Sequence, residues 1–147
     1  MRDLPGKLSV EELADLFQAK SSFVEALARE NHPLGRARDV LASLPEKDRI
    51  EALNAHPRIG QRRLSGRSAT EQGPAAVEDP EVLTELAWFN AAYEERFGFR
   101  FVVFVDHRPR AEIVPVLRER LERTREEELE TGCDELVAIA LDRWETG

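Results

Sequence analysis

Apolar residues recur every three to four positions along most of this chain, which is the spacing of one face of an α-helix. Examples are the stripes Leu13, Leu16 and Phe17 near the start, and Leu83, Leu86, Ala87, Asn90 and Tyr93 in the second half. Strict alternation of apolar and polar residues, which is typical of a half-buried strand, is nearly absent. The pattern therefore predicts an all-α fold.

Signals for helix starts and stops divide the N-terminal part of the chain into four helices. Ser9 and Glu12 have the spacing of a capping box, in which each side chain bonds the other residue's backbone N–H. A helix from Ser22 to Arg29 should stop before Pro33, because the residue ahead of a proline resists helical angles. Two shorter helices are expected, one near Ala37 to Ala42, and one after Pro45 with Ile50 and Leu53 facing inward.

The second half predicts a long helix that begins at Asp79-Pro80 and is ended by Gly98. The apolar run Phe99 to Val105 follows, and periodicity does not decide between a short strand and a buried extended segment. Two more helices are expected between Arg110 and Trp144, and the first must begin close before Pro115. The charge-rich stretch RERLERTREEELE between them is interpreted as a solvated helix surface with i,i+4 ion pairs.

Length and composition favour one soluble domain over residues 1–147, a single-domain bundle of about eight helices. A chain of 147 residues can bury one core without disulfides or structural metal. The lone Cys133 has no intramolecular partner, which fits a reducing cytoplasm. No signal peptide or membrane-spanning run is evident, so we expect no membrane association. The net charge of −8 argues against a nucleic-acid surface.

Charge is unevenly spread, because no acidic residue lies between Glu51 and Glu71. That interval contains four arginines, Arg58, Arg62, Arg63 and Arg67. A local basic region on an acidic protein suits a small anionic ligand better than a polymer. The four arginines either steer such an anion or are simply solvated.

His56 is the strongest candidate for acid/base chemistry. It stands before Pro57, at the end of a predicted helix and the start of the arginine-rich loop, where an imidazole would be partly exposed and rigidly placed. The alternative is a helix-terminal histidine that bonds the last carbonyls. His32 has the same His-Pro context without polar residues after it and is interpreted as structural, and His107 as a surface residue.

The segment Ser68 to Gln72 offers a hydroxyl, a carboxylate and an amide in close succession. Ser68 and Glu71 have the spacing of a plain capping box, which would explain them without any function. Both interpretations can hold together, because a helix N-terminus that faces a cavity offers free N–H donors to an anion.

Metal and nucleotide chemistry are poorly supported. The three histidines are far apart and lack ligand spacing, and no glycine-rich phosphate loop is present. Cys133 lies in a core-like helical pattern and is interpreted as a small buried hydrophobe. Enzymes that use a metal or a nucleotide are therefore disfavoured.

Several motifs together resemble those of OHCU decarboxylases, enzymes that act on 2-oxo-4-hydroxy-4-carboxy-5-ureidoimidazoline. They are HPRIG at 56–60, SATEQ at 68–72, Asn90 and Tyr93, RFGFRFVV at 96–103, and the closing IALDRW. The resemblance implies a helical homodimer that forms S-allantoin in urate breakdown, after urate oxidase and hydroxyisourate hydrolase, without metal or organic cofactor. A bacterial cytoplasm is the expected location.

Carried over residue by residue, the resemblance makes His56 the catalytic imidazole, and Glu71 would pair with it or assist proton delivery. It implies substrate contacts from Pro57, Ser68, Glu71, Gln72, Arg100, Phe101, Val102, Val103, Phe104 and Arg143. Around residues 100–104 it implies backbone amides as well as apolar walls along the ligand. For proton transfer near neutral pH we expect the pKa of His56 to lie near its ordinary value. Two rival interpretations remain: a related small-molecule lyase or hydrolase on the same scaffold, and a non-catalytic helical binding module.

Overall fold

The computed structural model describes residues 3–59 and 80–146, and within these ranges it contains seven helices and no strand. The helices are α1 (Val10–Phe17), α2 (Ser22–Ala28), α3 (Pro33–Ser43), α4 (Glu46–Asn54), α6 (Pro80–Phe97), α7 (Arg110–Arg120) and α8 (Arg125–Thr146). The predicted all-α fold is confirmed.

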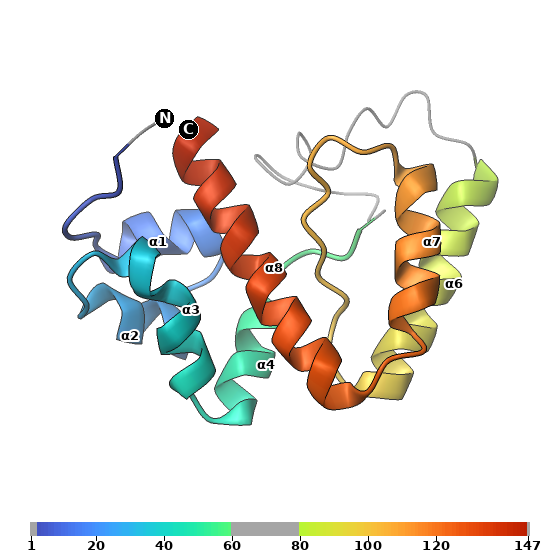
Figure 1. The fold of residues 1–147 in the computed structure, drawn as a ribbon, viewed down its shortest axis with the longest axis horizontal. Coiled ribbons are helices and arrows are strands. Elements are labelled where there is room, and N and C mark those ends of the chain that lie inside the picture. Colours follow the sequence, from blue (N-terminus) through green and yellow to red (C-terminus); the bar gives the residue numbers. More distant parts are fainter. Residues whose placement is uncertain (1–2, 60–79, 147) are drawn as a thin grey trace.

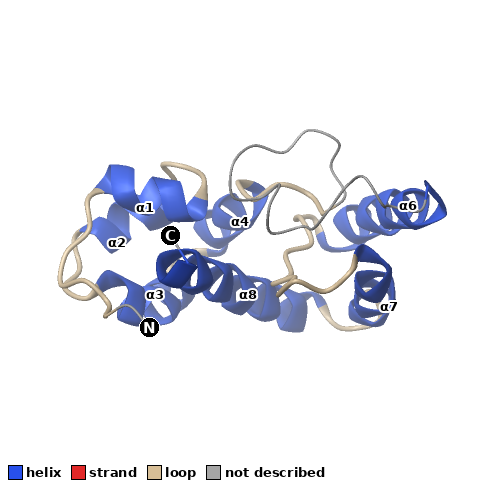
Figure 2. Cartoon of the chain, turned by 90° about the horizontal axis from the view of Figure 1, so that it is seen from above, coloured by secondary structure: helices blue, strands red, loops and turns tan. Residues whose placement is uncertain are grey.

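The long C-terminal helix α8 runs through the middle of the molecule (Figure 1). Its contacts with α1, α3 and α4 lie on one side, while α6 and α7 pack against each other on the other side (Figures 1 and 2). Buried apolar residues from all seven helices join in one hydrophobic core. Helix α8 is thus the central helix of the fold, and other helices lie on both sides of it.

Local signals at the N-terminus form as the sequence predicts. The Ser9 hydroxyl accepts from the Glu12 backbone N–H at 3.1 Å, and the Glu12 carboxylate accepts from the Ser9 N–H at 3.0 Å. The stop before Pro33 is also found, but the same proline starts the next helix. His32 adopts a left-handed φ of 53° and Pro33 is the first residue of α3, so this helix begins earlier than Ala37.

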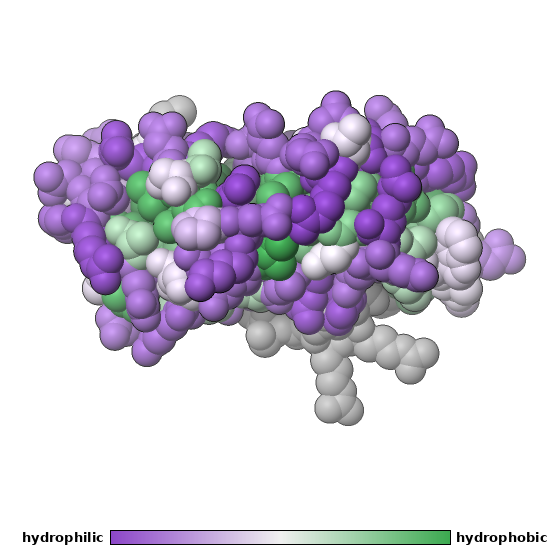
Figure 3. All heavy atoms as spheres, turned by 90° about the horizontal axis from the view of Figure 1, so that it is seen from below, coloured by the Kyte–Doolittle hydropathy of each residue, from purple (hydrophilic) through white to green (hydrophobic). Residues whose placement is uncertain are grey.

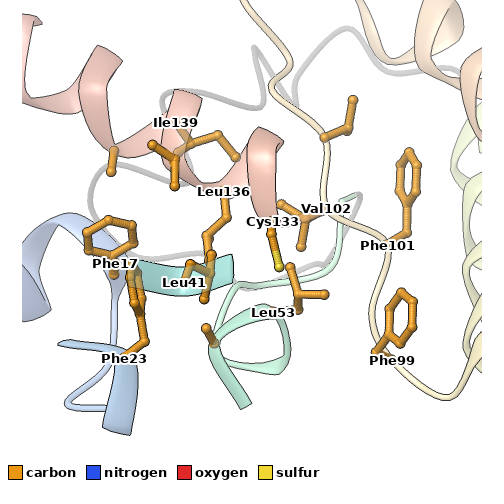
Figure 4. Close-up of a cluster of buried hydrophobic side chains, with 14 of the residues drawn as sticks. Phe17, Phe23, Leu41, Leu53, Phe99, Phe101, Val102, Cys133, Leu136 and Ile139 are labelled. Atoms are coloured by element: carbon orange, nitrogen blue, oxygen red, sulfur yellow. The ribbon is translucent and has the colours of Figure 1, made fainter. Parts of the chain in front are cut away.

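The run Phe99 to Val105 is an extended segment without strand partners in the described part of the chain. Gly98, with a φ of +82°, ends α6 and turns the chain into this segment. Figure 4 shows that Val102 points toward Cys133 of α8, whereas Phe99 and Phe101 point the other way. The Phe99 and Phe101 rings make edge contacts with Tyr93 of α6, so the segment fills the space between α8 and α6.

The interpretation of the charge-rich stretch as one solvated helix surface is only partly confirmed, because most of its charged residues are exposed but the helix is interrupted and two of the charges are buried. Helix α7 ends at Arg120, and α8 starts at Arg125 after a capping box between Thr124 and Glu127. The Arg120 and Glu128 side chains turn inward, and these residues are 6% and 0% exposed. Tertiary packing, rather than i,i+4 pairing along one helix, decides where these charges lie. Pro115 is the sixth residue of α7 and lies inside the helix, so α7 begins further before it than the sequence analysis expected.

The surface is mostly hydrophilic in the view of Figure 3, with smaller apolar areas between the polar side chains. Trp88 on α6 is 66% exposed, whereas Trp144 is partly buried and its indole N–H donates to the Asp3 carbonyl at 3.1 Å. Among the described helices, none is long and apolar enough to cross a membrane.

Candidate active site

His56 lies directly after α4, where the chain leaves the helix. Its backbone N–H donates to the Leu53 carbonyl at 3.1 Å, and Pro57 prevents the helix from continuing. The Arg100 side chain donates to the His56 carbonyl at 3.1 Å, while the Arg100 N–H donates to the Asn54 side-chain oxygen at 3.0 Å. The backbone of His56 is thus fixed from both α4 and the extended segment.

The His56 imidazole is buried, with only 7% of the residue exposed. Its Nδ1 is fully buried and has no hydrogen-bond partner among the described residues. Burial, together with the positive charges of Arg143 and Arg100, lowers the pKa of His56 from 6.5 to about 3. The expected near-ordinary pKa is therefore not found, and the ring is neutral at pH 7 in this environment.

A pocket opens in front of this imidazole and encloses about 500 Å³, its open mouth included. Most of its wall is apolar, and its described lining is His56, Pro57, Ile59, Phe101, Val103, Phe104, Val105, Asp106, His107, Ile139 and Asp142. A buried imidazole in a largely apolar hollow with a few polar groups is the usual architecture of a small-molecule site.

The segment after His56 is held against α6 by two contacts. The Asn90 amide donates to the Ile59 carbonyl at 3.1 Å, and Asn90 is 4% exposed. Arg58 forms a two-bond ion pair with Glu94, which raises the pKa of the Arg58 guanidinium through the hydrogen bond to that carboxylate. The Arg58 side chain is also 44% exposed, so the interpretation of this arginine as solvated fits, with its charge paired to Glu94 at the surface.

The predicted residues of the extended segment divide into two groups. Phe101, Val103 and Phe104 line the pocket, whereas Val102 is turned into the core and Arg100 toward the backbone of His56. The Phe104 N–H donates to the Glu135 carboxylate at 3.3 Å, so this amide is already used within the protein. The apolar wall expected from the sequence is present on three side chains of the segment.

Arg143 is 1% exposed and lies between α8 and the end of α1. Its Nη1 donates to the Leu16 carbonyl at 2.5 Å, and its Nη2 donates to the Gln18 side chain at 3.3 Å. It is not among the residues that line the described pocket, although its charge acts on His56. The neighbouring Asp142 is a pocket residue instead.

Six pocket residues were missed by the sequence interpretation: the polar Asp106, His107 and Asp142, and the apolar Ile59, Val105 and Ile139. Asp106 and His107 form a turn with φ of 50° and 63°, and both are exposed at the pocket, so His107 is a surface residue that also lines the site. His32, in contrast, is exposed and bonds Gly6 through its backbone, as its structural interpretation predicted. The spacing of apolar residues does not indicate that the Asp106-His107 turn lies at a pocket. The sequence contained one indication for Asp142, its position next to Arg143.

Other predicted residues lie outside the described part of the chain: Ser68, Glu71, Gln72, Arg62, Arg63 and Arg67. Cys133 is buried as predicted, and burial raises the pKa of its thiol to about 12, which keeps it protonated. Within residues 3–59 and 80–146, no group of three or more His, Cys, Asp or Glu side chains is placed to hold a metal.

The sequence of this chain is similar to proteins named for uric acid degradation or for one decarboxylase. It is 36% identical over 100 residues to the Arabidopsis thaliana uric acid degradation bifunctional protein TTL, covering 63% of this chain and 31% of that protein. It is 26% identical over 142 residues to a Haloferax volcanii 2-oxo-4-hydroxy-4-carboxy-5-ureidoimidazoline decarboxylase, covering 89% and 83%. The mouse protein of that name is 32% identical over 105 residues, covering 67% and 59%.

The fold agrees with the sequence matches. A crystal structure of an OHCU decarboxylase in the presence of (S)-allantoin superposes with a TM-score of 0.75 at 30% identity, covering 90% of this chain and 94% of that one. The matched region is less than two thirds of several relatives, including the plant protein. The family model for OHCU decarboxylase matches residues 3–145, and the chain therefore belongs to the OHCU decarboxylase family.

Proposed function

We propose that this protein decarboxylates 2-oxo-4-hydroxy-4-carboxy-5-ureidoimidazoline to (S)-allantoin. The observation that carries the proposal is the buried His56 with an unpartnered Nδ1 at a largely apolar pocket, in a chain of this family. A binding module would not need a buried, electrostatically tuned imidazole. A related lyase or hydrolase would share this site, and the experiment below distinguishes it.

The reaction suits a protein that works without a metal or organic cofactor. Loss of CO2 leaves an electron pair on carbon, and the conjugated imidazoline of the substrate can delocalise that pair itself. The protein must then hold the carboxylate out of the ring plane and return one proton to one face of the product.

Neutral His56 becomes a proton carrier only when negative charge enters the pocket. The imidazolium is disfavoured by burial and by the charges of Arg143 and Arg100, and an anionic substrate would offset both cations. Substrate binding would therefore raise the pKa of His56 and allow it to take up and deliver the proton. Proton transfer by a positioned group typically contributes ~10²–10⁴-fold.

The remaining roles follow from placement and from the family resemblance. Pro57, Phe101, Val103 and Phe104 would form the apolar wall against the substrate. Arg100 and Arg143 would act mainly through their charge near His56, with Val102 supporting the wall from behind. Glu71 would orient His56 or assist proton delivery, and Ser68 and Gln72 would contact the ureidoimidazoline.

The setting of the protein is part of the same proposal. The substrate would come from urate through urate oxidase and hydroxyisourate hydrolase, and the relatives named for uric acid degradation support that context. A homodimer is proposed from the family resemblance, with the exposed Trp88 as a candidate contact. A bacterial cytoplasm is proposed because the single, buried thiol of Cys133 fits a reducing compartment.

The test is circular dichroism of allantoin formed from urate by urate oxidase and hydroxyisourate hydrolase, with and without this protein. The His56→Asn variant should lose most of the rate, whereas His32→Asn should keep it. His32 is a matched control, since it too precedes a proline but is exposed, and asparagine tolerates its left-handed backbone. Racemic allantoin at the uncatalysed rate with the wild-type protein would contradict the proposal and favour the altered-substrate alternative.

A further inference from the structure

A buried ionic cluster lies behind the pocket wall. Its centre is Glu128, at the start of α8, which is 0% exposed. The Glu128 carboxylate accepts from the Tyr93 hydroxyl at 2.6 Å, from Arg120 Nε at 2.7 Å and from Arg123 Nη1 at 2.9 Å. Burial and the hydrogen bond to Glu128 raise the pKa of the Tyr93 hydroxyl, which therefore stays a donor.

Arg120 connects this cluster to the pocket. Its Nη1 donates to the Val102 carbonyl at 2.8 Å, and its guanidinium lies 4.5 Å from the centre of the Phe101 ring. Phe101 lines the pocket, so the Arg120 side chain contacts both the backbone of the pocket wall, at Val102, and the Phe101 ring of that wall. Arg123 binds Glu128 and the Thr131 hydroxyl, and the hydrogen bonds and ion pairs of its side chain involve no residue of the pocket lining.

This anchoring matters because the extended segment lacks strand partners in the described ranges. A backbone outside a helix or sheet must find its hydrogen bonds elsewhere. The Arg120 bond to Val102 is charge-assisted, and its geometry is set by the fork of the guanidinium and by Glu128. A shift of this bond would move the Phe101 wall relative to His56.

We propose that Arg120, oriented by Glu128, is a positioning residue that sets the Phe101 wall and thereby the affinity for the substrate; this role rests on the proposed function. Arg120 does not touch the substrate and acts through Phe101 and Val102. Because a wall contacts the substrate in the ground state and the transition state alike, its displacement changes KM more than kcat.

The test compares Arg120→Lys with Arg123→Lys in the coupled allantoin assay. Both variants keep a positive charge beside Glu128, but an ammonium at position 120 cannot bond Glu128 and the Val102 carbonyl with the same two-pronged geometry. We expect Arg120→Lys to raise KM roughly tenfold, which corresponds to about 1.4 kcal/mol of substrate binding lost when the Phe101 wall shifts, with kcat within about twofold. Arg123→Lys should leave KM unchanged even where urea unfolding shows a comparable loss of stability.

A merely structural cluster would lower stability in both variants and leave both KM values at the wild-type level, which overturns the positioning role. If Arg120→Lys does not fold, Tyr93→Phe decides, because it removes one bond to Glu128 without changing any charge. A KM raised about two- to threefold supports the role, and an unchanged KM overturns it. Wild-type protein that forms no (S)-allantoin overturns the proposed function, and this role with it.

Discussion

The Arg58 guanidinium grips the Glu94 carboxylate with two hydrogen bonds, from Nε at 2.5 Å and from Nη2 at 2.8 Å. Arg58 follows the His56-Pro57 pair, and Glu94 lies on α6, so the ion pair joins the pocket wall to that helix. Arg58 lies beside the pocket, where a free positive charge could attract an anionic substrate. Its charge is instead compensated by the Glu94 carboxylate. In this structure the pair joins the segment after His56 to α6 at the surface.

The first prediction concerns that ion pair. The Arg58 side chain is 44% exposed, and exposed pairs contribute about 0–1 kcal/mol, so Arg58→Gln should change the free energy of unfolding only slightly. Because Arg58→Gln alone leaves the Glu94 carboxylate unpaired, the slope of kcat/KM against ionic strength is measured in the double variant Arg58→Gln, Glu94→Gln, where it should match that of the wild-type protein. A clearly shallower slope in the double variant would show that this arginine attracts the substrate after all.

The second prediction concerns Asn90, whose amide donates to the Ile59 carbonyl. Because both groups are buried, Asn90→Ala leaves a carbonyl without its partner and should cost about 1–3 kcal/mol of stability in urea unfolding. Activity should fall with it, since Ile59 lines the pocket. Thr84→Ala on the same helix is the control, because its exposed hydroxyl bonds only the Pro80 carbonyl. Equal losses in the two variants would contradict the assignment.

Parts of this fold that depend on interactions between residues close in sequence were predicted correctly. The capping box of Ser9 and Glu12 involves residues three positions apart, so its outcome depends on little else. Gly98 ends α6 for an equally local reason, since its positive φ suits a residue without a side chain. The place of His56 at the end of α4 was predicted in the same way, from Pro57 after it, but the predicted partial exposure of its imidazole was wrong, because the residue is 7% exposed.

Distant partners explain what the sequence did not predict. Whether Glu128 is solvated or buried depends on Tyr93, which lies 35 positions earlier, and no charge pattern within RERLERTREEELE reports that contact. The pKa of His56 likewise depends on the burial of its ring and on the charges of Arg143 and Arg100, which become neighbours only in the fold. Asp142 and His107 join the pocket from α8 and from a turn for the same reason.

The third prediction concerns Asp142, which is one of the residues that line the pocket. A negative charge there opposes an anionic substrate, so Asp142→Asn should lower KM by roughly threefold, as expected for one charge interaction in a partly solvated site. Asp134→Asn, on the exposed side of the same helix, is the matched control and should leave KM unchanged. A raised KM in Asp142→Asn would show instead that the carboxylate accepts hydrogen bonds from the substrate.

The last prediction uses the pKa of His56, which is about 3 in the folded protein against 6.5 for an ordinary histidine. Between these values the unfolded chain binds a proton on this imidazole and the folded protein does not, so stability falls as the pH is lowered from about 6.5 toward 3. The slope contributed by this one group is about 1.4 kcal/mol per pH unit. Above pH 6.5 the group contributes no pH dependence, because both states are neutral.

Urea unfolding of the wild-type protein and of His56→Asn at pH 7.5 and pH 5 isolates this contribution, since all other titrating groups are common to both. The wild-type protein should lose roughly 2 kcal/mol more than the variant between the two pH values. Identical losses would mean that His56 takes up its proton in the folded state near neutral pH. The imidazole would then carry a proton before the substrate arrives, and the substrate-driven rise in its pKa would have no part in the reaction.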